Sequence, residues 1–194
     1  MPNVITLTGP SGSGKSTVLS CLLRFGQKGF KTVLVPKYTT RDSRRDDHGE
    51  AVSVQAIPKS CNLVYEQYGV RYGLDIETVF TCLAQGETPV VILNDVRTVQ
   101  DVRTALGPLV RSIFVFRERP SFETQKRLSE ARNVTNEDDI RRRFDKAQAI
   151  YRIYIENIQI FDHVIINSGS RLLLRSQVRQ VLNGLRQVKS WPLH

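Results

Sequence analysis

The stretch that decides the fold is Gly9-Pro10-Ser11-Gly12-Ser13-Gly14-Lys15-Ser16-Thr17, which follows the apolar run Val4-Ile5-Thr6-Leu7. It matches the pattern GxxxxGK[ST], in which glycines let backbone N–H groups converge on a phosphate at the start of a helix. The apolar run predicts a buried strand, and the apolar spacing after the loop predicts a helix from Ser16 to Phe25. The order strand, loop, helix indicates a site for a nucleoside triphosphate.

The loop pattern also assigns roles to single residues. Lys15 is expected to reach the β- and γ-phosphates, and the Ser16 hydroxyl is expected to ligate Mg²⁺. The alternative is a plain Gly/Ser-rich turn, which the flanking strand and helix disfavour. Nine residues are therefore predicted to bind the nucleotide: Gly9, Pro10, Ser11, Gly12, Ser13, Gly14, Lys15, Ser16 and Thr17.

Length and composition predict one globular domain of ordinary size. The chain has 194 residues, of which 40% are hydrophobic and 24% are charged, enough for a single core. Cys21, Cys61 and Cys82 lack the spacing of a zinc site or a disulfide framework. The sequence shows neither an apolar run of membrane-span length nor a secretory signal, so a cytoplasmic protein is expected. A net charge of +9 favours anionic partners without distinguishing nucleotides, phosphorylated sugars and nucleic acids.

Along the chain, short β-branched runs alternate with segments of helical period. Five strands are predicted, near residues 4–7, 32–35, 90–93, 113–116 and 164–166. Besides the first helix, helices are predicted near residues 75–84, 99–105, 122–131 and 137–159. This alternation is typical of a parallel α/β sheet with helices on both faces. The stretch from about 39 to 73 breaks the alternation and is interpreted as an insert over the edge of the sheet.

A second group of basic residues follows the second predicted strand, in Lys37-Tyr38-Thr39-Thr40-Arg41-Asp42-Ser43-Arg44. A guanidinium group can bind two oxygens of one phosphate through two parallel hydrogen bonds, so Arg41 and Arg44 suit the phosphate of an acceptor beside the nucleotide site. A solvated basic loop is the alternative interpretation.

The order of these motifs resembles the guanylate kinase family, from Val4 to about Asn167. In that family a TTRxxR segment clamps the phosphate of the acceptor GMP, at the positions of Arg41 and Arg44, and a Tyr-Gly pair corresponds to Tyr72-Gly73 and adds Tyr72 to the phosphate site. The resemblance therefore implies ATP and Mg²⁺ as cofactors and phosphoryl transfer to a small phosphorylated acceptor.

A third resemblance concerns a mobile lid. The family carries RLxxR and IxxR elements whose arginines close on the ATP phosphates, here Arg132 and Arg143. Positioned cations of this kind stabilise the charge of the migrating phosphoryl group. A static, salt-bridged helix face is the alternative, and it is the preferred interpretation for Arg141 and Arg142. Ser121 is expected to cap the helix that starts the lid.

Together the motifs predict a P-loop kinase of α/β class, with a five-stranded parallel sheet sandwiched by helices, a short acceptor-binding insert and a lid. The single domain 1–194 is divided into a core of residues 1–37, 74–131 and 144–194, an insert of residues 38–73 and a lid of residues 132–143. Lys15, Arg132 and Arg143 are the predicted catalytic residues. Arg41, Arg44, Tyr72 and Asp95 are the predicted acceptor-binding residues, with Asp95 contacting either the acceptor or a Mg²⁺-bound water.

The resemblance fails where a guanine base should be recognised. Guanylate kinases use two carboxylates there, whereas this chain offers Asp47 or Glu50 for the first and Leu63 at the position of the second. At the third predicted strand, either Asn94 or Asp95 replaces the family aspartate.

The chain also resembles ribose 1,5-bisphosphate phosphokinases, which share the fold without needing guanine contacts, in Tyr38-Thr39-Thr40-Arg41-Asp42, in Leu93-Asn94 followed by Arg97, and in Asn167-Ser168-Gly169-Ser170. GMP is therefore the first predicted acceptor and ribose 1,5-bisphosphate the second. A non-catalytic binding module of the same fold is a third possibility, disfavoured because Lys15 and Ser16 are kept. No nucleic-acid and no membrane partner is expected, because two phosphate sites account for much of the positive charge and no aromatic-basic RNA motif is present.

Overall fold

The computed structural model describes residues 3–10, 12–26, 31–43, 49–67, 69–93, 95–118, 121–130 and 136–187. Its centre is a five-stranded sheet in the order β2-β7-β1-β8-β9, with every neighbouring pair parallel. The strands are β1 (Val4–Thr8), β2 (Thr32–Leu34), β7 (Thr88–Ile92), β8 (Val110–Phe116) and β9 (His163–Ile166). The predicted fold class is confirmed, and strands β1 and β7 are buried along their whole length because helices cover both faces.

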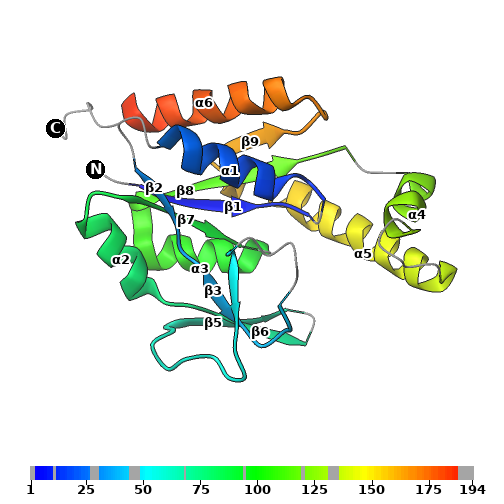
Figure 1. Cartoon of the computed structure of the whole chain (residues 1–194), viewed down its shortest axis with the longest axis horizontal. Helices are drawn as coiled ribbons and strands as arrows, with labels where there is room; N and C mark the ends of the chain where they lie inside the picture. Colours follow the sequence, from blue (N-terminus) through cyan, green and yellow to red (C-terminus); the bar gives the residue numbers. More distant parts are fainter. Residues whose placement is uncertain are drawn as a thin grey trace.

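Helices α1 (Lys15–Gly26) and α6 (Arg171–Gln187) cover one face of this sheet, while α2 (Ile76–Ala84) and α3 (Val96–Leu106) cover the other (Figure 1). Helices α4 (Phe122–Glu130) and α5 (Glu137–Glu156) extend away from the sheet at one end. The C-terminal part of α5 returns to the core, where Tyr154 packs on Phe114 and Phe161. Two short 3-10 helices span Gly107–Leu109 and Ile158–Ile160.

Helix ends follow the side chains that the sequence provides there. Asp75 caps α2 by accepting from the Glu77 and Thr78 N–H groups at 3.0 and 3.4 Å. The Ser121 hydroxyl accepts from the Thr124 N–H at 3.2 Å, which confirms the cap predicted for α4. Asn136 caps α5, whose first turn holds three acidic residues. Side-chain acceptors and negative charge both stabilise helix N-termini.

The segment interpreted as an irregular insert contains a second sheet. Its order is β4-β3-β6-β5 and it lies beside the main sheet, on the side of α2 and α3 (Figure 1). The strands are β3 (Lys37–Thr39), β4 (Ala51–Ser53), β5 (Leu63–Gln67) and β6 (Val70–Leu74). Strand β5 alternates half-buried and exposed side chains, so it offers no continuous apolar run.

Helix α6 lies outside the helices predicted from the sequence. Its apolar stripe, Leu174, Val178, Leu182 and Leu185, is buried against α1 and the sheet. The Gln177 side chain donates to the Ile166 carbonyl and accepts from the Ile166 N–H, both at 2.8 Å. This amide thereby satisfies the backbone of the edge strand β9 as a neighbouring strand would.

Candidate functional site

The loop between β1 and α1 is tightly enclosed at two of its glycines, Gly9 and Gly14. A Cβ on Gly9 would lie 2.6 Å from the Val115 carbonyl oxygen. Gly14 has φ +98° and a Cβ there would lie 2.4 Å from the Asn167 amide nitrogen. No larger residue fits at either position without a shift of the loop.

Two side chains from outside the loop hold its backbone. Asn167, just after β9, donates to the Ser13 carbonyl at 2.8 Å. Arg117, just after β8, donates to the Gly12 carbonyl at 3.1 Å. Both residues follow the carboxyl ends of parallel strands, where open α/β sheets place their ligand crevice. The loop pattern alone gave no signal for either contact.

Lys15 points back onto the loop that carries it. Its ammonium donates to the Gly9 carbonyl at 2.8 Å and to the Pro10 carbonyl at 3.1 Å. Burial lowers the pKa of Lys15, and the nearby Glu50 carboxylate opposes that shift. Because this ammonium group is partly desolvated and is held by neutral carbonyls, an anionic ligand bound next to it would stabilise its charge.

The loop and the insert meet at one hydrogen bond. The Ser16 hydroxyl donates to Glu50 Oε1 at 3.0 Å, across 34 residues of sequence. Glu50 lies just before β4, and its backbone carbonyl accepts from the Lys37 N–H at 3.2 Å. Sequence reasoning considered Glu50 as a reader of the acceptor base, but in the structure its carboxylate contacts the phosphate-loop helix.

The insert gathers aromatic and basic groups next to that contact. Tyr72 is 7% exposed, and its ring stacks on the Tyr65 ring at 5.2 Å between centroids. The Lys37 ammonium lies over the Tyr72 ring, with its nitrogen 5.1 Å from the ring centroid. Arg41 follows β3 and donates to the Asp42 carbonyl at 2.9 Å. The structure therefore brings the predicted residues Arg41 and Tyr72 into the same small sheet, and it adds Lys37, which sequence analysis did not single out.

The predicted acceptor residue Asp95 and Asn62 of the insert both have structural partners. Asp95 is the N-cap of α3, and its carboxylate accepts from the Thr98 N–H at 2.8 Å and the Thr98 hydroxyl at 2.6 Å. The Asn62 amide oxygen accepts from the Ile76 N–H at 2.8 Å. Leu63 packs against the apolar core, and Glu66 is exposed on β5. None of these contacts forms a base-reading pair within the described residues.

Several predicted site residues lie outside the part of the chain that the structure describes: Ser11, Arg44, Asp47, Asn94, Arg132 and the side chain of Arg143. Their assigned roles stay predictions. At the start of α5, Arg142 pairs with Asp139 at 2.5 Å, and the Arg141 guanidinium lies 4.8 Å from the Phe122 ring centroid. Both contacts support the static interpretation of this charge run.

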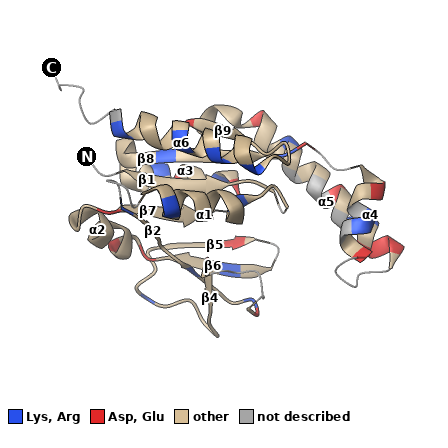
Figure 2. Cartoon of the chain, turned by 45° about the horizontal axis from the view of Figure 1, so that its top comes forward, with Lys and Arg blue, Asp and Glu red and all other residues tan. Residues whose placement is uncertain are grey.

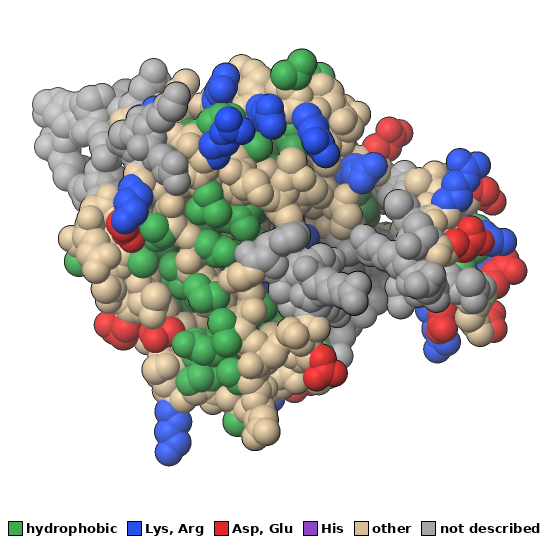
Figure 3. Space-filling model, in the orientation of Figure 1, with side chains coloured by type: hydrophobic (Ala, Val, Ile, Leu, Met, Phe, Trp, Pro, Cys, Tyr) green, Lys and Arg blue, Asp and Glu red, His purple; other side chains and the backbone are tan. Residues whose placement is uncertain are grey.

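A basic groove runs from the phosphate loop along α1 and α6. A hollow of about 410 Å³ is lined by Ser16 and Thr17 at the loop and by Arg24, Arg171 and Arg175 along the helices. Helix α6 carries four arginines and no acidic residue, so positive charge follows its exposed side (Figures 2 and 3).

Among the described residues, no group of three His, Cys, Asp or Glu side chains is arranged to hold a metal ion. Likewise, none of the helices in this part of the chain is long and apolar enough to cross a membrane.

The fold and the phosphate loop define the class of P-loop phosphotransferases, here with a second, small sheet beside the main one. Comparisons identify its family: residues 1–171 match the guanylate kinase family. Curated guanylate kinases are similar to the chain, including that of Mannheimia succiniciproducens, 34% identical over 85% of this chain and 80% of its own length. The guanylate kinase of Neisseria meningitidis serogroup A is 30% identical over 97% of this chain and 90% of its own length. The chain belongs to the guanylate kinase family.

A solved structure agrees at the level of the fold. The guanylate kinase of Anaplasma phagocytophilum has a TM-score of 0.63 and 17% identity to this chain, covering 98% of this chain and 87% of its own. This likeness supports the predicted fold class, and the family match and the curated relatives confirm the predicted family and phosphotransferase activity.

Proposed function

We propose that this chain transfers the γ-phosphoryl group of ATP to GMP, giving ADP and GDP. The observation that carries the proposal is the contact between Ser16 and Glu50 at 3.0 Å, because it brings the phosphate loop against the acceptor insert. The similarity to curated guanylate kinases supports GMP as the acceptor.

The loop residues suit the ATP phosphates. The hydroxyls of Thr8 and Ser13 are buried and lack a hydrogen-bond partner within the described structure, and buried donors of this kind call for a ligand or a water. Gly9 lies close to the Val115 carbonyl, and a glycine-rich loop before a helix can direct backbone N–H groups at a phosphate. Gly9 to Thr17 would hold the nucleotide, with Lys15 on its terminal phosphates.

Mg²⁺ also fits this site. It prefers oxygen ligands and keeps several waters, and the Ser16 hydroxyl supplies one oxygen at the loop. When bound, the ion would neutralise part of the charge of the transferring phosphoryl group.

On the acceptor side, Arg41, Arg44 and Tyr72 would hold the phosphate of GMP, and Asp95 would orient the acceptor or a water. Arg132 and Arg143, from the lid of residues 132–143, would close on ATP. The acceptor phosphate is already an anionic nucleophile, so positioning and charge neutralisation suffice without a general base. We expect no nucleic-acid or membrane partner and a cytoplasmic location.

Ribose 1,5-bisphosphate is a second candidate acceptor. The observation that favours it is the buried Lys37, which adds a positive charge near Arg41. In the same region, the carboxylates that the structure describes do not form a pair that could bind a guanine base. A doubly phosphorylated acceptor has more negative charge to offer such a group.

A coupled assay of ADP release with GMP, dGMP, AMP and ribose 1,5-bisphosphate tests the proposal. A site that pairs buried polar groups with a base can reject a wrong base by about 10⁴-fold, so we expect GMP to be used with weaker discrimination against AMP than that. Turnover with the sugar bisphosphate alone would replace GMP by the second candidate. Absence of turnover with all four acceptors would favour the remaining alternative, a non-catalytic binding module of the same fold.

A further inference from the structure

Lys37 is a buried basic residue whose position is unusual for a lysine. It is the first residue of β3 and is 4% exposed. Its ammonium donates to the carbonyl of Ile92 at 3.0 Å, at the carboxyl end of strand β7. It also lies over the Tyr72 ring. A lysine is rarely buried to this degree unless an anion pairs with it, yet its closest oxygen partner in the described structure is a neutral carbonyl.

Charged groups from four neighbouring segments act on Lys37. Lys15 lies on the side of the phosphate loop, and Arg41 lies on the side of the acceptor insert. The carboxylates of Glu50 and Asp95 oppose these two cations. Lys37 is therefore close enough to interact electrostatically with both the group expected to bind the donor phosphates and the group expected to bind the acceptor phosphate.

This environment makes the charge of Lys37 adjustable. Burial lowers its pKa to about 7, with Lys15 and Arg41 contributing and Glu50 and Asp95 opposing. Phosphates bound next to Lys15 and Arg41 would favour the charged form, because an opposite charge within a few ångströms stabilises the ammonium. An arginine at this position could not respond in this way, since it stays protonated.

We propose that Lys37 is a positioning residue of the phosphoryl-transfer site that takes up one proton from solvent when donor and acceptor bind, and then holds their phosphates together with Lys15 and Arg41. The proposal rests on the proposed function, because it requires two phosphate-bearing ligands between those residues. The step is a proton transfer: a buffer acid gives up its proton, and the amine nitrogen gains one N–H bond to become an ammonium group.

Calorimetric binding of ADP and GMP to the full chain, at about pH 7.5 in buffers of different ionisation enthalpy, measures the protons taken up on binding. We expect the wild type to take up at least about half a proton more than Lys37→Met and Lys37→Arg, since neither variant can titrate there. Lys37→Arg keeps the charge and guards against a folding defect in Lys37→Met. Lys31→Met is the matched control, because Lys31 is exposed and pairs with Glu87 away from the site.

Equal proton uptake by the wild type and both Lys37 variants would overturn the proposal. A second readout is the pH dependence of kcat/KM for GMP. The inflection of kcat/KM near pH 7 should disappear in Lys37→Arg. In Lys37→Met, kcat/KM should fall by about tenfold or more, as expected for the loss of one preorganised charge. A wild type that binds both ligands with this proton uptake but never releases ADP product would refute the proposed function and leave the role of Lys37 standing. If GMP does not bind, ribose 1,5-bisphosphate takes its place in the same titration.

Discussion

At the scale of single residues, the structure explains why Lys15 should matter more for turnover than for folding. Its ammonium is held by two loop carbonyls that could bind water instead. We expect Lys15→Ala to lower kcat by about a hundredfold or more, the scale of losing one preorganised electrostatic contact, while the circular dichroism spectrum stays unchanged. Turnover at the wild-type rate in the purified variant would contradict the assignment of Lys15 to the donor phosphates.

Lys37 gives a pH dependence of stability whose sign can be worked out. Its pKa in the folded chain is about 7, below the value of about 10.4 in an unfolded chain. Between these values the unfolded state binds more protons, so the free energy of unfolding of the ligand-free protein should rise with pH. The slope from one such group is at most about 1.4 kcal/mol per pH unit.

Urea unfolding at several pH values from about 7 to 9 measures this slope. Lys37→Met should reduce it, and Lys15, whose pKa is also lowered by burial, should retain a contribution of the same sign. A slope equal in Lys37→Met and the wild type would show that Lys37 is not the group responsible.

The same scale shows what the sequence could predict of the site. Lys15, Ser16 and Arg41 were found because each belongs to a local pattern whose residues are close together in the chain. The contact of Glu50 with Ser16 joins residues 34 positions apart, and no local pattern reports such a pairing. Lys37 was missed for a related reason, since its burial depends on how β3 packs against β7 and not on its neighbours in sequence.

At the scale of elements, the start of α5 gives a test of the lid. Asn136 caps it through its side chain to the Asp139 N–H and through its carbonyl to the Ile140 N–H, both at 3.1 Å. Even a capped helix end can fray at low free-energy cost compared with the helix interior. We expect amide hydrogen exchange over residues 135–139 to be fast in the free protein and slowed when ATP and acceptor are both present. Equal protection in both states would favour the static salt-bridged helix.

Helix α6 concentrates positive charge, which should cost stability. Arg171, Arg175 and Arg179 follow one another at intervals of four residues and are exposed. Like charges at this spacing destabilise a helix by about 0.2–0.5 kcal/mol per pair. Arg175→Gln removes two such pairs, so it should stabilise the protein by several tenths of a kcal/mol at low salt and by less at about 1 M salt.

The matched control for that prediction is Arg152→Gln on α5, where Glu156 stands four residues further on. That substitution removes an attraction and should not stabilise the protein. Stabilisation of similar size in both variants, measured by urea unfolding, would show that the charge spacing on α6 is not the cause.

The same helix marks the limit of prediction at this scale. The main sheet could be predicted because its strands are short β-branched runs, of which β1 and β7 are buried along their whole length. Helix α6 could also have been predicted, because its apolar residues Leu174, Val178, Leu182 and Leu185 have helical spacing. The resemblance to the guanylate kinase family, however, ends near Asn167, before this helix begins. The second sheet could not be read in this way, since its strands have only three to five residues and half-exposed faces.

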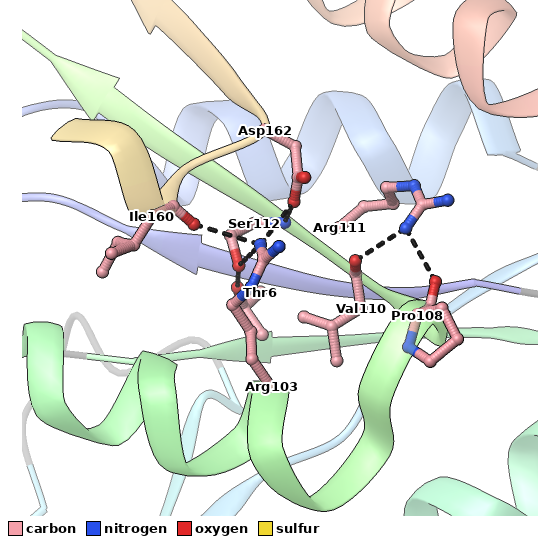
Figure 4. Close-up of polar contacts among 8 residues, drawn as sticks. All are labelled: Thr6, Arg103, Pro108, Val110, Arg111, Ser112, Ile160 and Asp162. Carbon is pink, nitrogen blue, oxygen red and sulfur yellow. Dashed lines mark hydrogen bonds and ion pairs between the residues drawn. The ribbon is translucent and has the colours of Figure 1, made fainter.

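At the scale of the whole molecule, two apolar cores lie on opposite faces of the main sheet, and a polar network joins the elements around them. Arg103 of α3 pairs with Asp162 at 2.7 Å and also donates to the Ile160 carbonyl at 3.0 Å (Figure 4). The same Asp162 oxygen accepts from the N–H of Ser112 on β8 at 2.7 Å. The Ser112 hydroxyl in turn accepts from Thr6 of β1 at 2.9 Å. Helix α3, two central strands and the approach to β9 thus depend on one carboxylate.

Replacing that carboxylate should affect the stability of the whole domain. Asp162→Ala leaves the N–H of the fully buried Ser112 without its acceptor and removes the partner of Arg103. Because an unsatisfied buried donor costs about 1–3 kcal/mol, we expect a loss of about 2–3 kcal/mol in the free energy of unfolding, with a single cooperative transition. Arg142→Ala is the control, since it breaks an ion pair whose two side chains are 76% and 46% exposed, and such surface pairs contribute at most about 1 kcal/mol. An equal loss of stability in the two variants, measured by urea unfolding, would show that the network around Asp162 contributes no more than an exposed ion pair. The apolar cores alone would then have to hold α3 against the sheet.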